Sequence, residues 1–291
     1  MIEFIQQTMN GLVMGSSYVL IALGLTLIFG MLNMMNFAHG ELLMVGAFTA
    51  VGLISVLNVP YLLAFPIVIV VVAFLGIIME KLAFKPLRKS DRVNLLVSSL
   101  GVSIILQNGV QLIWGPDPRG LTSPFSNSQI VIGDIILNGH RIFIFVTALV
   151  LIAILYYVIQ RTNIGIAMRA CAFDMDIARL MGVKANTIIF LTFFMGAGLA
   201  AAAGMLLAPI FSVYPTMGVS ATMKAFVVII LGGVGNISGA IAGGLLIGLI
   251  ETYAAGYISS EYKDVFAFII MILVLLFKPA GLFGKHVQEK V

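Results

Sequence analysis

Residues 61–79 read YLLAFPIVIVVVAFLGIIM, an apolar stretch without a single charged side chain. Its length matches the roughly 20 residues that an α-helix needs to cross the hydrocarbon core of a membrane. A transmembrane β-strand would instead alternate apolar and polar residues over a shorter segment. Because lipid offers no partner to a free backbone amide or carbonyl, this stretch predicts a membrane-spanning helix.

The composition of the whole chain points the same way. Of its 291 residues, 61% are hydrophobic and 10% are charged, whereas soluble domains carry roughly 25% charged residues. Nine apolar segments can be read, at 9–30, 40–57, 61–80, 93–113, 142–160, 186–208, 224–236, 239–257 and 264–278. The seventh is short and rich in glycine, as expected of a half-helix. We therefore predict an all-α, polytopic membrane protein with eight or nine transmembrane segments, some broken or short, in one domain over residues 1–291.

The distribution of Lys and Arg predicts the orientation. All but four of these 16 residues lie in three clusters, at 81–92, at 161–184 and in the C-terminal tail. Basic residues in short loops favour the cytoplasmic side, so we place the clusters inside and the N-terminus outside. The longest outer loop, 114–141, is punctuated by Gly and Pro and is expected to form an irregular periplasmic cap. The net charge of +4 reflects this distribution and does not indicate binding to nucleic acid.

Several chemistries are missing from the sequence. It has no G-x-x-x-x-G-K-[ST] phosphate loop and no loop long enough for a nucleotide-binding domain. A pump built on this chain therefore takes its energy from a partner or from an ion gradient. Ion-coupled carriers usually hold ionisable residues within their spans, and few are found here: His39, Glu41, Glu80 and Glu251. The single cysteine, Cys171, excludes an internal disulfide, and no cluster suits a metal or cofactor.

The inner segment 161–185 is unusually long and only partly polar. Its pattern predicts one helix, on which mostly small residues share a stripe: Cys171, Asp174, Met175, Ala178 and Gly182. Small residues let another surface approach the backbone closely, whereas a helix on a lipid surface carries large apolar and basic side chains. Two interpretations stay open: a docking helix for a cytoplasmic partner, or a helix that lies on the inner leaflet or simply connects two spans.

A polar interruption, Asn36-Phe-Ala-His-Gly-Glu41, follows the first span. Irregular backbone within a membrane survives only where protein or a water-filled cavity satisfies it, and broken helices often line transport pathways. Asn36, His39 and Glu41 are therefore candidates for a pathway or gating role. The alternative is that Asn36 or His39 caps the next helix. His39 and Glu41 would point in different directions from a helix, which makes them a poor metal pair.

A second interruption, Gly232-Gly-Val-Gly-Asn236, lies within a glycine-rich stretch. Glycines spaced by four, as at Gly244 and Gly248, predict close packing of membrane helices. The break itself exposes amide groups at a helix end, which suits an anionic group such as a carboxylate. We therefore count four further pathway candidates beside the packing interpretation: Gly232, Gly233, Gly235 and Asn236.

These stretches together resemble the permeases of branched-chain amino-acid ABC importers. The segment 165–183 is similar to the cytoplasmic coupling loop of that family at Arg169, Ala170, Asp174, Ala178, Gly182 and Val183. Phe173 departs from the family, which commonly has a polar residue there. The motif at 36–41, the glycine-rich stretch 232–248 and the segment 261–284 also resemble the family. The resemblance runs from about residue 8 to residue 285.

The resemblance implies a type II ABC importer permease in the bacterial inner membrane, with no ATPase and no cofactor of its own. The implied partners are a second homologous permease, two ATPase subunits and a periplasmic substrate-binding protein, and the implied substrates are leucine, isoleucine and valine. In the family the coupling loop docks on the ATPase, which assigns that role to six residues: Arg169, Ala170, Cys171, Asp174, Ala178 and Gly182.

Three alternatives remain. The resemblance also covers permeases for urea or short-chain amides, which use a very similar scaffold. An ion-coupled carrier or a channel would work alone and respond to a gradient instead of ATP. An intramembrane enzyme would rely on His39 and Glu41, although no nucleophile is visible beside them.

Overall fold

The computed structural model describes residues 2–88, 90–132 and 135–284. Three lysines that the sequence places in the inner clusters, Lys89, Lys285 and Lys290, lie outside these residues. Within the described part, each of the nine predicted apolar segments corresponds to a helix. The prediction of an all-α membrane protein is therefore confirmed.

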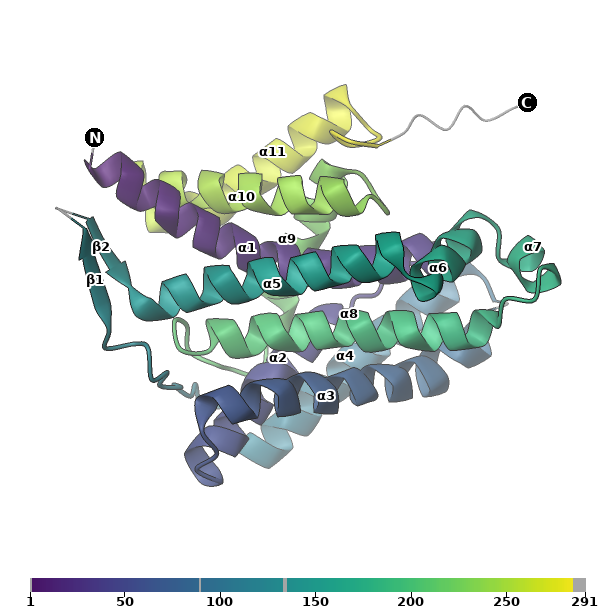
Figure 1. The fold of residues 1–291 in the computed structure, drawn as a ribbon, viewed down its shortest axis with the longest axis horizontal. Helices are drawn as coiled ribbons and strands as arrows, with labels where there is room; N and C mark the ends of the chain where they lie inside the picture. Colours follow the sequence, from purple (N-terminus) through teal and green to yellow (C-terminus); the bar gives the residue numbers. More distant parts are fainter. Residues whose placement is uncertain (1, 89, 133–134, 285–291) are drawn as a thin grey trace.

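The bundle contains α1 (Ile2–Leu32), α2 (His39–Val51), α3 (Tyr61–Met79), α4 (Arg92–Trp114), α5 (Gly139–Arg161), α8 (Ala185–Leu207), α9 (Met217–Gly232), α10 (Ile237–Tyr257) and α11 (Lys263–Phe277). Helices α3, α5 and α8 run roughly side by side, whereas α9 crosses behind them (Figure 1). The π-helical turn η1 (Gly52–Val56) extends α2, and η2 (Glu80–Phe84) and the 3-10 turn η3 (Lys85–Leu87) extend α3. A further 3-10 turn, η4 (Ser260–Tyr262), precedes α11.

Seven helical segments of the described chain are long and apolar enough to cross a membrane: Ile2–Leu32, His39–Val56, Tyr61–Leu87, Arg92–Trp114, Gly139–Arg161, Ala185–Leu207 and Ile237–Tyr257. Two apolar helices are shorter, since α9 has 16 residues and α11 has 15. At about 1.5 Å per residue, neither spans a full hydrocarbon core in a straight line.

Helices α1 and α8 form the centre of the bundle. In the most apolar 18 residues of each, 78% are buried, against 17% in α4 and 22% in α5. The outer helices therefore present apolar side chains to lipid. Glycines allow the central helices to touch: a Cβ atom added to Gly15 of α1 would lie 2.9 Å from the carbonyl oxygen of Gly244 in α10. This contact agrees with the packing role predicted for glycines spaced by four.

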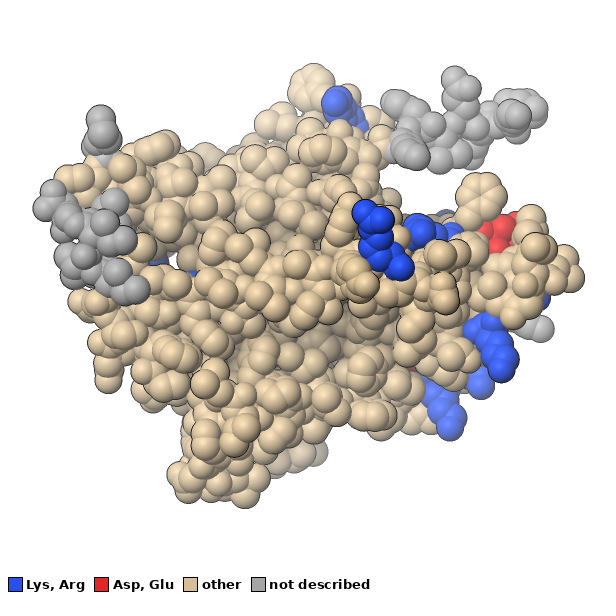
Figure 2. All heavy atoms as spheres, in the orientation of Figure 1, with Lys and Arg blue, Asp and Glu red and all other residues tan. Residues whose placement is uncertain are grey.

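The basic clusters of the sequence gather at one end of the bundle. Figure 2 shows Lys and Arg side chains mostly at that end, around α6 (Asn163–Phe173) and α7 (Met175–Leu180). Arg88 connects the first cluster to the start of α8 there, because its Nη1 donates to Asn186 Oδ1 at 2.7 Å. The N-terminus of α1 and the turn between η1 and α3 lie at the opposite end (Figure 1).

Two helices begin inside the bundle instead of at its surface. After α1 ends, residues 33–38 turn back, and His39 at the start of α2 lies with its Nε2 3.1 Å from the carbonyl oxygen of Ile21, well within α1. The first two turns of α9 meet the start of α2, where the amide of Gly40 donates to Thr222 Oγ1 at 3.0 Å. The broken helix predicted after the first span is therefore present.

The outer loop 114–141 is more regular than the sequence predicts. Strands β1 (Gln129–Ile132) and β2 (Ile135–Asn138) pair in antiparallel fashion, with Gln129 opposite Asn138. The expectation of a wholly irregular cap was therefore wrong. The hairpin escapes prediction because its strands are short and lie among Gly, Pro and Ser residues that are typical of loops.

Candidate functional site

The segment predicted to dock on a partner consists of two helices instead of one. Helix α6 begins at Thr162, whose Oγ1 accepts from the amide of Gly165 at 3.2 Å. Asp174 then interrupts it, because its Oδ1 accepts from the amides of Asp176 and Ile177, both at 2.9 Å, and so caps α7. The backbone of an N-cap residue is not helical, and Asp174 has extended φ and ψ values of −155° and 114°. The predicted continuous helix was therefore wrong.

The surface of this segment also differs from the predicted stripe. Cys171 and Ala178 are only 2% and 3% exposed and pack against the chain itself, and burial raises the pKa of the Cys171 thiol. Large apolar side chains face outward instead: Phe173, Ile177, Leu180 and Met181. Gly182 follows α7 with a φ of +86°, a conformation that suits glycine after a helix. The coupling role of the six predicted residues remains a prediction.

A groove of about 730 Å³ separates this segment from the other basic cluster. Its charged lining residues are Lys85, Arg88, Asp174, Asp176 and Arg179. On the far side of α6, Arg169 donates to the carbonyl oxygen of Ile159 near the end of α5. The segment is thus attached to the bundle on one side and faces a polar groove on the other.

The polar residues before α2 make contacts within the chain. Asn36 is buried, and its Oδ1 accepts from the amide of Ala38 at 3.0 Å. His39 Nε2 donates to the carbonyl oxygen of Ile21 in α1. Glu41 points to α4 instead and accepts from Ser103 Oγ at 2.9 Å and from the Gln107 side chain at 2.7 Å. His39 and Glu41 therefore join α2 to different helices and do not converge on one reacting atom. Their predicted gating role is not tested by these contacts.

The glycine-rich break between α9 and α10 is closed by neighbouring backbone. Gly233 and Gly235 adopt φ values of +99° and +77°, which explains why glycine is needed there. Asn236 caps α10, because its side-chain Oδ1 accepts from the backbone amide of Gly239 at 3.0 Å. The Nδ2 of the same side chain donates to the carbonyl oxygen of Phe283 at 2.8 Å. The helix end predicted for an anion is thus capped by the chain itself, and a pathway role remains a prediction.

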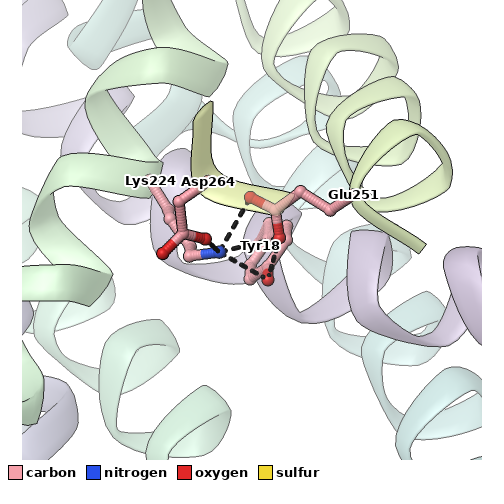
Figure 3. A network of polar contacts seen from close by, with 4 residues as sticks. All are labelled: Tyr18, Lys224, Glu251 and Asp264. Carbon is pink, nitrogen blue, oxygen red and sulfur yellow. Dashed lines mark hydrogen bonds and ion pairs between the residues drawn. The ribbon is translucent and has the colours of Figure 1, made fainter. Parts of the chain in front are cut away.

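A partly buried charge cluster joins four helices (Figure 3). The Nζ of Lys224 in α9 lies 2.7 Å from both carboxylate oxygens of Glu251 in α10 and 2.9 Å from Oδ1 of Asp264 in α11. Tyr18 in α1 donates to Glu251 Oε2 at 2.6 Å, and its ring lies 5.0 Å from the Lys224 Nζ. One cation therefore faces two carboxylates and an aromatic face.

Sequence reasoning did not select this cluster. Lys224 is the one charged residue of α9, and Glu251 is the one charged residue of α10. A single charge in an apolar helix is costly in lipid unless it pairs with an opposite charge. One lone cation and one lone anion in consecutive apolar helices therefore could have predicted an ion pair. Which helices lie side by side, however, is a property of the tertiary structure.

The cluster adjoins two cavities. The first, of about 290 Å³, reaches Lys224 and Asp264 and has an apolar wall formed by α1, α2, α8 and α9. The second, of about 280 Å³, reaches Glu251 and Arg141. Both are lined by Met14, Tyr18, Phe211 and Lys263. Small-molecule sites in proteins have this character, with apolar walls and a few polar groups that fix orientation.

The fold and these sites define a polytopic helical membrane protein whose broken helices meet inside the bundle. Residues 7–275 match the family described as the permease component of branched-chain amino acid transport systems, and the chain belongs to that family. The resemblance found in the sequence is thereby confirmed.

Curated relatives cover nearly the whole chain. The high-affinity branched-chain amino acid transport system permease protein BraD of Pseudomonas aeruginosa is 41% identical over 99% of this chain and 98% of its own length. LivH of Escherichia coli, with the same description, is 40% identical with the same coverage. A probable branched-chain amino acid transport permease of Methanocaldococcus jannaschii is 31% identical over 91% of this chain and 88% of its own length. No solved structure matches the chain.

Proposed function

We propose that this chain is the membrane permease subunit of an ATP-driven importer that moves leucine, isoleucine and valine into the bacterial cytoplasm. The observation that carries the proposal is the likeness, at 40–41% identity over 99% of the chain, to permeases named for that transport. The partners are a second, homologous permease, two ATPase subunits and a periplasmic substrate-binding protein. The chain itself supplies the helical body through which the substrate passes.

The proposed orientation places the basic end of the bundle in the cytoplasm. Lys and Arg in short loops favour that side of a membrane, and α6, α7 and the extension of α3 gather at the basic end (Figure 2). The hairpin β1–β2 and the cavities beside Tyr18 then lie toward the periplasm. This orientation presents the cavities to a periplasmic binding protein and the segment 161–185 to the ATPases.

The segment formed by α6 and α7 is proposed to receive the ATPase. Its outward apolar residues, Phe173, Leu180 and Met181, are 92%, 87% and 80% exposed, and exposed apolar side chains rimmed by charge are typical of protein contacts. The residues assigned by resemblance would shape this surface: Asp174 starts α7, Gly182 ends it, and Cys171 and Ala178 pack it on the bundle.

The same segment adjoins the break between α9 and α10. Arg169 and Gln160 line a cavity of about 440 Å³ together with Gly235 and Asn236. A push on α6 would therefore reach the inner end of α9, whose other end lies at the start of α2. We propose that ATP binding and hydrolysis by the partners shift the bundle between outward-open and inward-open states through this contact.

Reconstitution tests the proposal. Pulling on the tagged chain should bring down the second permease and the ATPase subunits, and the binding protein loaded with leucine should raise their ATP turnover. In proteoliposomes, leucine uptake should require enclosed ATP and persist when a protonophore removes the gradient. Uptake that ignores ATP and collapses with the gradient would establish an ion-coupled carrier instead. Transport of urea in place of leucine would favour the amide-permease alternative.

A further inference from the structure

We propose that Lys224 and Asp264, supported by Glu251 and Tyr18, bind the ammonium and carboxylate groups of an amino acid within this chain. The inference rests on the proposed function, since it assumes that an amino acid passes through the bundle. It adds the place where the substrate is held and the chemical groups that are recognised.

The two carboxylates of the cluster are not equivalent. The side chain of Glu251 is 5% exposed, and it is fixed by the Tyr18 hydroxyl and by two contacts to Lys224. The side chain of Asp264 is 52% exposed and makes one contact to Lys224, at 2.9 Å. Water reaches Asp264, so the pair between Lys224 and Asp264 is the one that a ligand can open at low cost.

A zwitterion fits the opened pair better than any singly charged ligand. Its carboxylate would take the ammonium of Lys224, and its own ammonium would take the carboxylate of Asp264. One ion pair is then replaced by two, and the net charge of the cluster does not change. A simple carboxylate would displace Asp264 and leave it without its cation, while also facing Glu251. A simple amine would take Asp264 from Lys224 and bring no carboxylate in its place, so one ion pair would only be exchanged for another.

The neighbouring wall suits an aliphatic side chain. The cavity of about 290 Å³ that reaches Lys224 and Asp264 has an apolar wall that includes Ile21, Leu43, Leu207 and Met217, while Lys263, Ser212 and Ser220 add polar groups elsewhere in its lining. An amino acid with its charged groups at the cluster would direct its side chain toward this wall. Burial of about one CH₂ group stabilises by roughly 0.8 kcal/mol, so the wall favours branched aliphatic chains over small ones.

The position of the cluster agrees with a site reached from the periplasm in the proposed orientation. The second of the adjoining cavities includes Gln7 and Gly256, which lie near the outer ends of α1 and α10. The rival explanation is a structural clamp that only ties α9, α10 and α11 together. A clamp needs the charges to be paired with one another and is indifferent to any solute.

The direct test is substrate protection of a cysteine placed in the cavity. Ala221→Cys puts a thiol among the lining residues, and the natural Cys171 is buried and serves as the blank. The complete complex, in nanodiscs, is labelled with a small maleimide. Leucine should slow labelling by the factor of about 1 + [L]/Kd for one site. Ser220→Cys is the second position if the first variant loses uptake.

The chemical arms use two analogues of leucine. 4-Methylpentanoate lacks the ammonium, and 3-methylbutylamine lacks the carboxylate. Neither should protect at concentrations at which leucine protects fully. Equal protection by either analogue would overturn the recognition of both charged groups.

The variant arms separate binding from clamping. Asp264→Asn should reduce the apparent affinity of leucine about tenfold or more, as expected for loss of a charged hydrogen bond. The matched control is Glu261→Gln, an exposed acid in η4 that forms no ion pair among the described residues. The double variant Lys224→Met with Glu251→Gln leaves no unpaired charge between them, and should assemble normally yet show no protection by leucine.

Two results would refute the inference while sparing the proposed function. One is ATP-driven leucine uptake by the unsubstituted complex without any protection of either cysteine. The other is equal protection in the Asp264→Asn, double and unsubstituted backgrounds, which is the result expected of a clamp. Failure of the unsubstituted complex to take up leucine at all would instead refute the proposed function.

Discussion

Replacing Lys224 by methionine removes the cation of the cluster but leaves Glu251 buried. The side chain of Glu251 would keep only the hydroxyl of Tyr18, at 2.6 Å, as its partner. Breaking a buried ion pair by removing one partner costs about 3–5 kcal/mol, because the remaining charge has lost its water and its counter-ion. Lys224→Met alone should therefore destabilise the folded chain by about this amount. Asp264, which is half-exposed, should contribute little to the loss.

The double variant Lys224→Met with Glu251→Gln removes the unpaired charge and should recover most of that loss, since a neutral amide can still accept from Tyr18. The assay is unfolding of the purified chain in mixed micelles as the fraction of a denaturing detergent is raised. The two single variants and the double form a double-mutant cycle, and the coupling should reach the upper part of the range of roughly 0.5–3 kcal/mol. Additive losses, or a Lys224→Met variant as stable as the double, would refute the reasoning.

Three further predictions concern other parts of the fold. Phe173→Asp should weaken co-purification of the ATPase subunits, whereas Phe173→Leu should not, because the outward side chain makes an apolar contact in the proposed assembly. Asp174→Ala should cost about 0.5–2 kcal/mol of local stability, because α7 loses its N-cap. Amide hydrogen exchange in α7 should therefore be faster in this variant than in the control Asp176→Ala, which loses only an exposed ion pair. Gly15→Ala should push α1 away from α10 and lower the thermal stability, because the added Cβ atom would lie 2.9 Å from the backbone of α10. The control Gly101→Ala places its Cβ atom where nothing lies within 4 Å, so the thermal stability should stay unchanged or rise.

The helices could be predicted because the information lies along the chain. A run such as residues 61–79 must become a helix in lipid whatever packs beside it. The two breaks were likewise visible, since polar residues at 36–41 and glycines at 232–235 interrupt otherwise apolar stretches. In both cases a local feature of the sequence determines the local structure.

The failures have a different physical origin. Asp174 is equally compatible with a helix interior and with a helix cap when only periodicity is considered. In the fold Asp174 is the cap, and its carboxylate accepts hydrogen bonds from two backbone amides of α7, both at 2.9 Å. The cluster around Lys224 needed knowledge of three helix contacts that bring residues 18, 224, 251 and 264 together (Figure 3). No pattern within a single helix contains that information.

The contacts divide the polar residues of the bundle into two kinds. Asn36, His39 and Glu41 are each 0% exposed, and their described hydrogen bonds join neighbouring segments of the chain. Such bonds replace water for backbone that is irregular inside the membrane, which explains their presence without a solute. Lys224 and Asp264 instead pair at the edge of a cavity, where a solute can compete. Whether a polar residue within a membrane binds a solute is therefore better judged from whether a solute can reach its ion pair than from how rare polar residues are there.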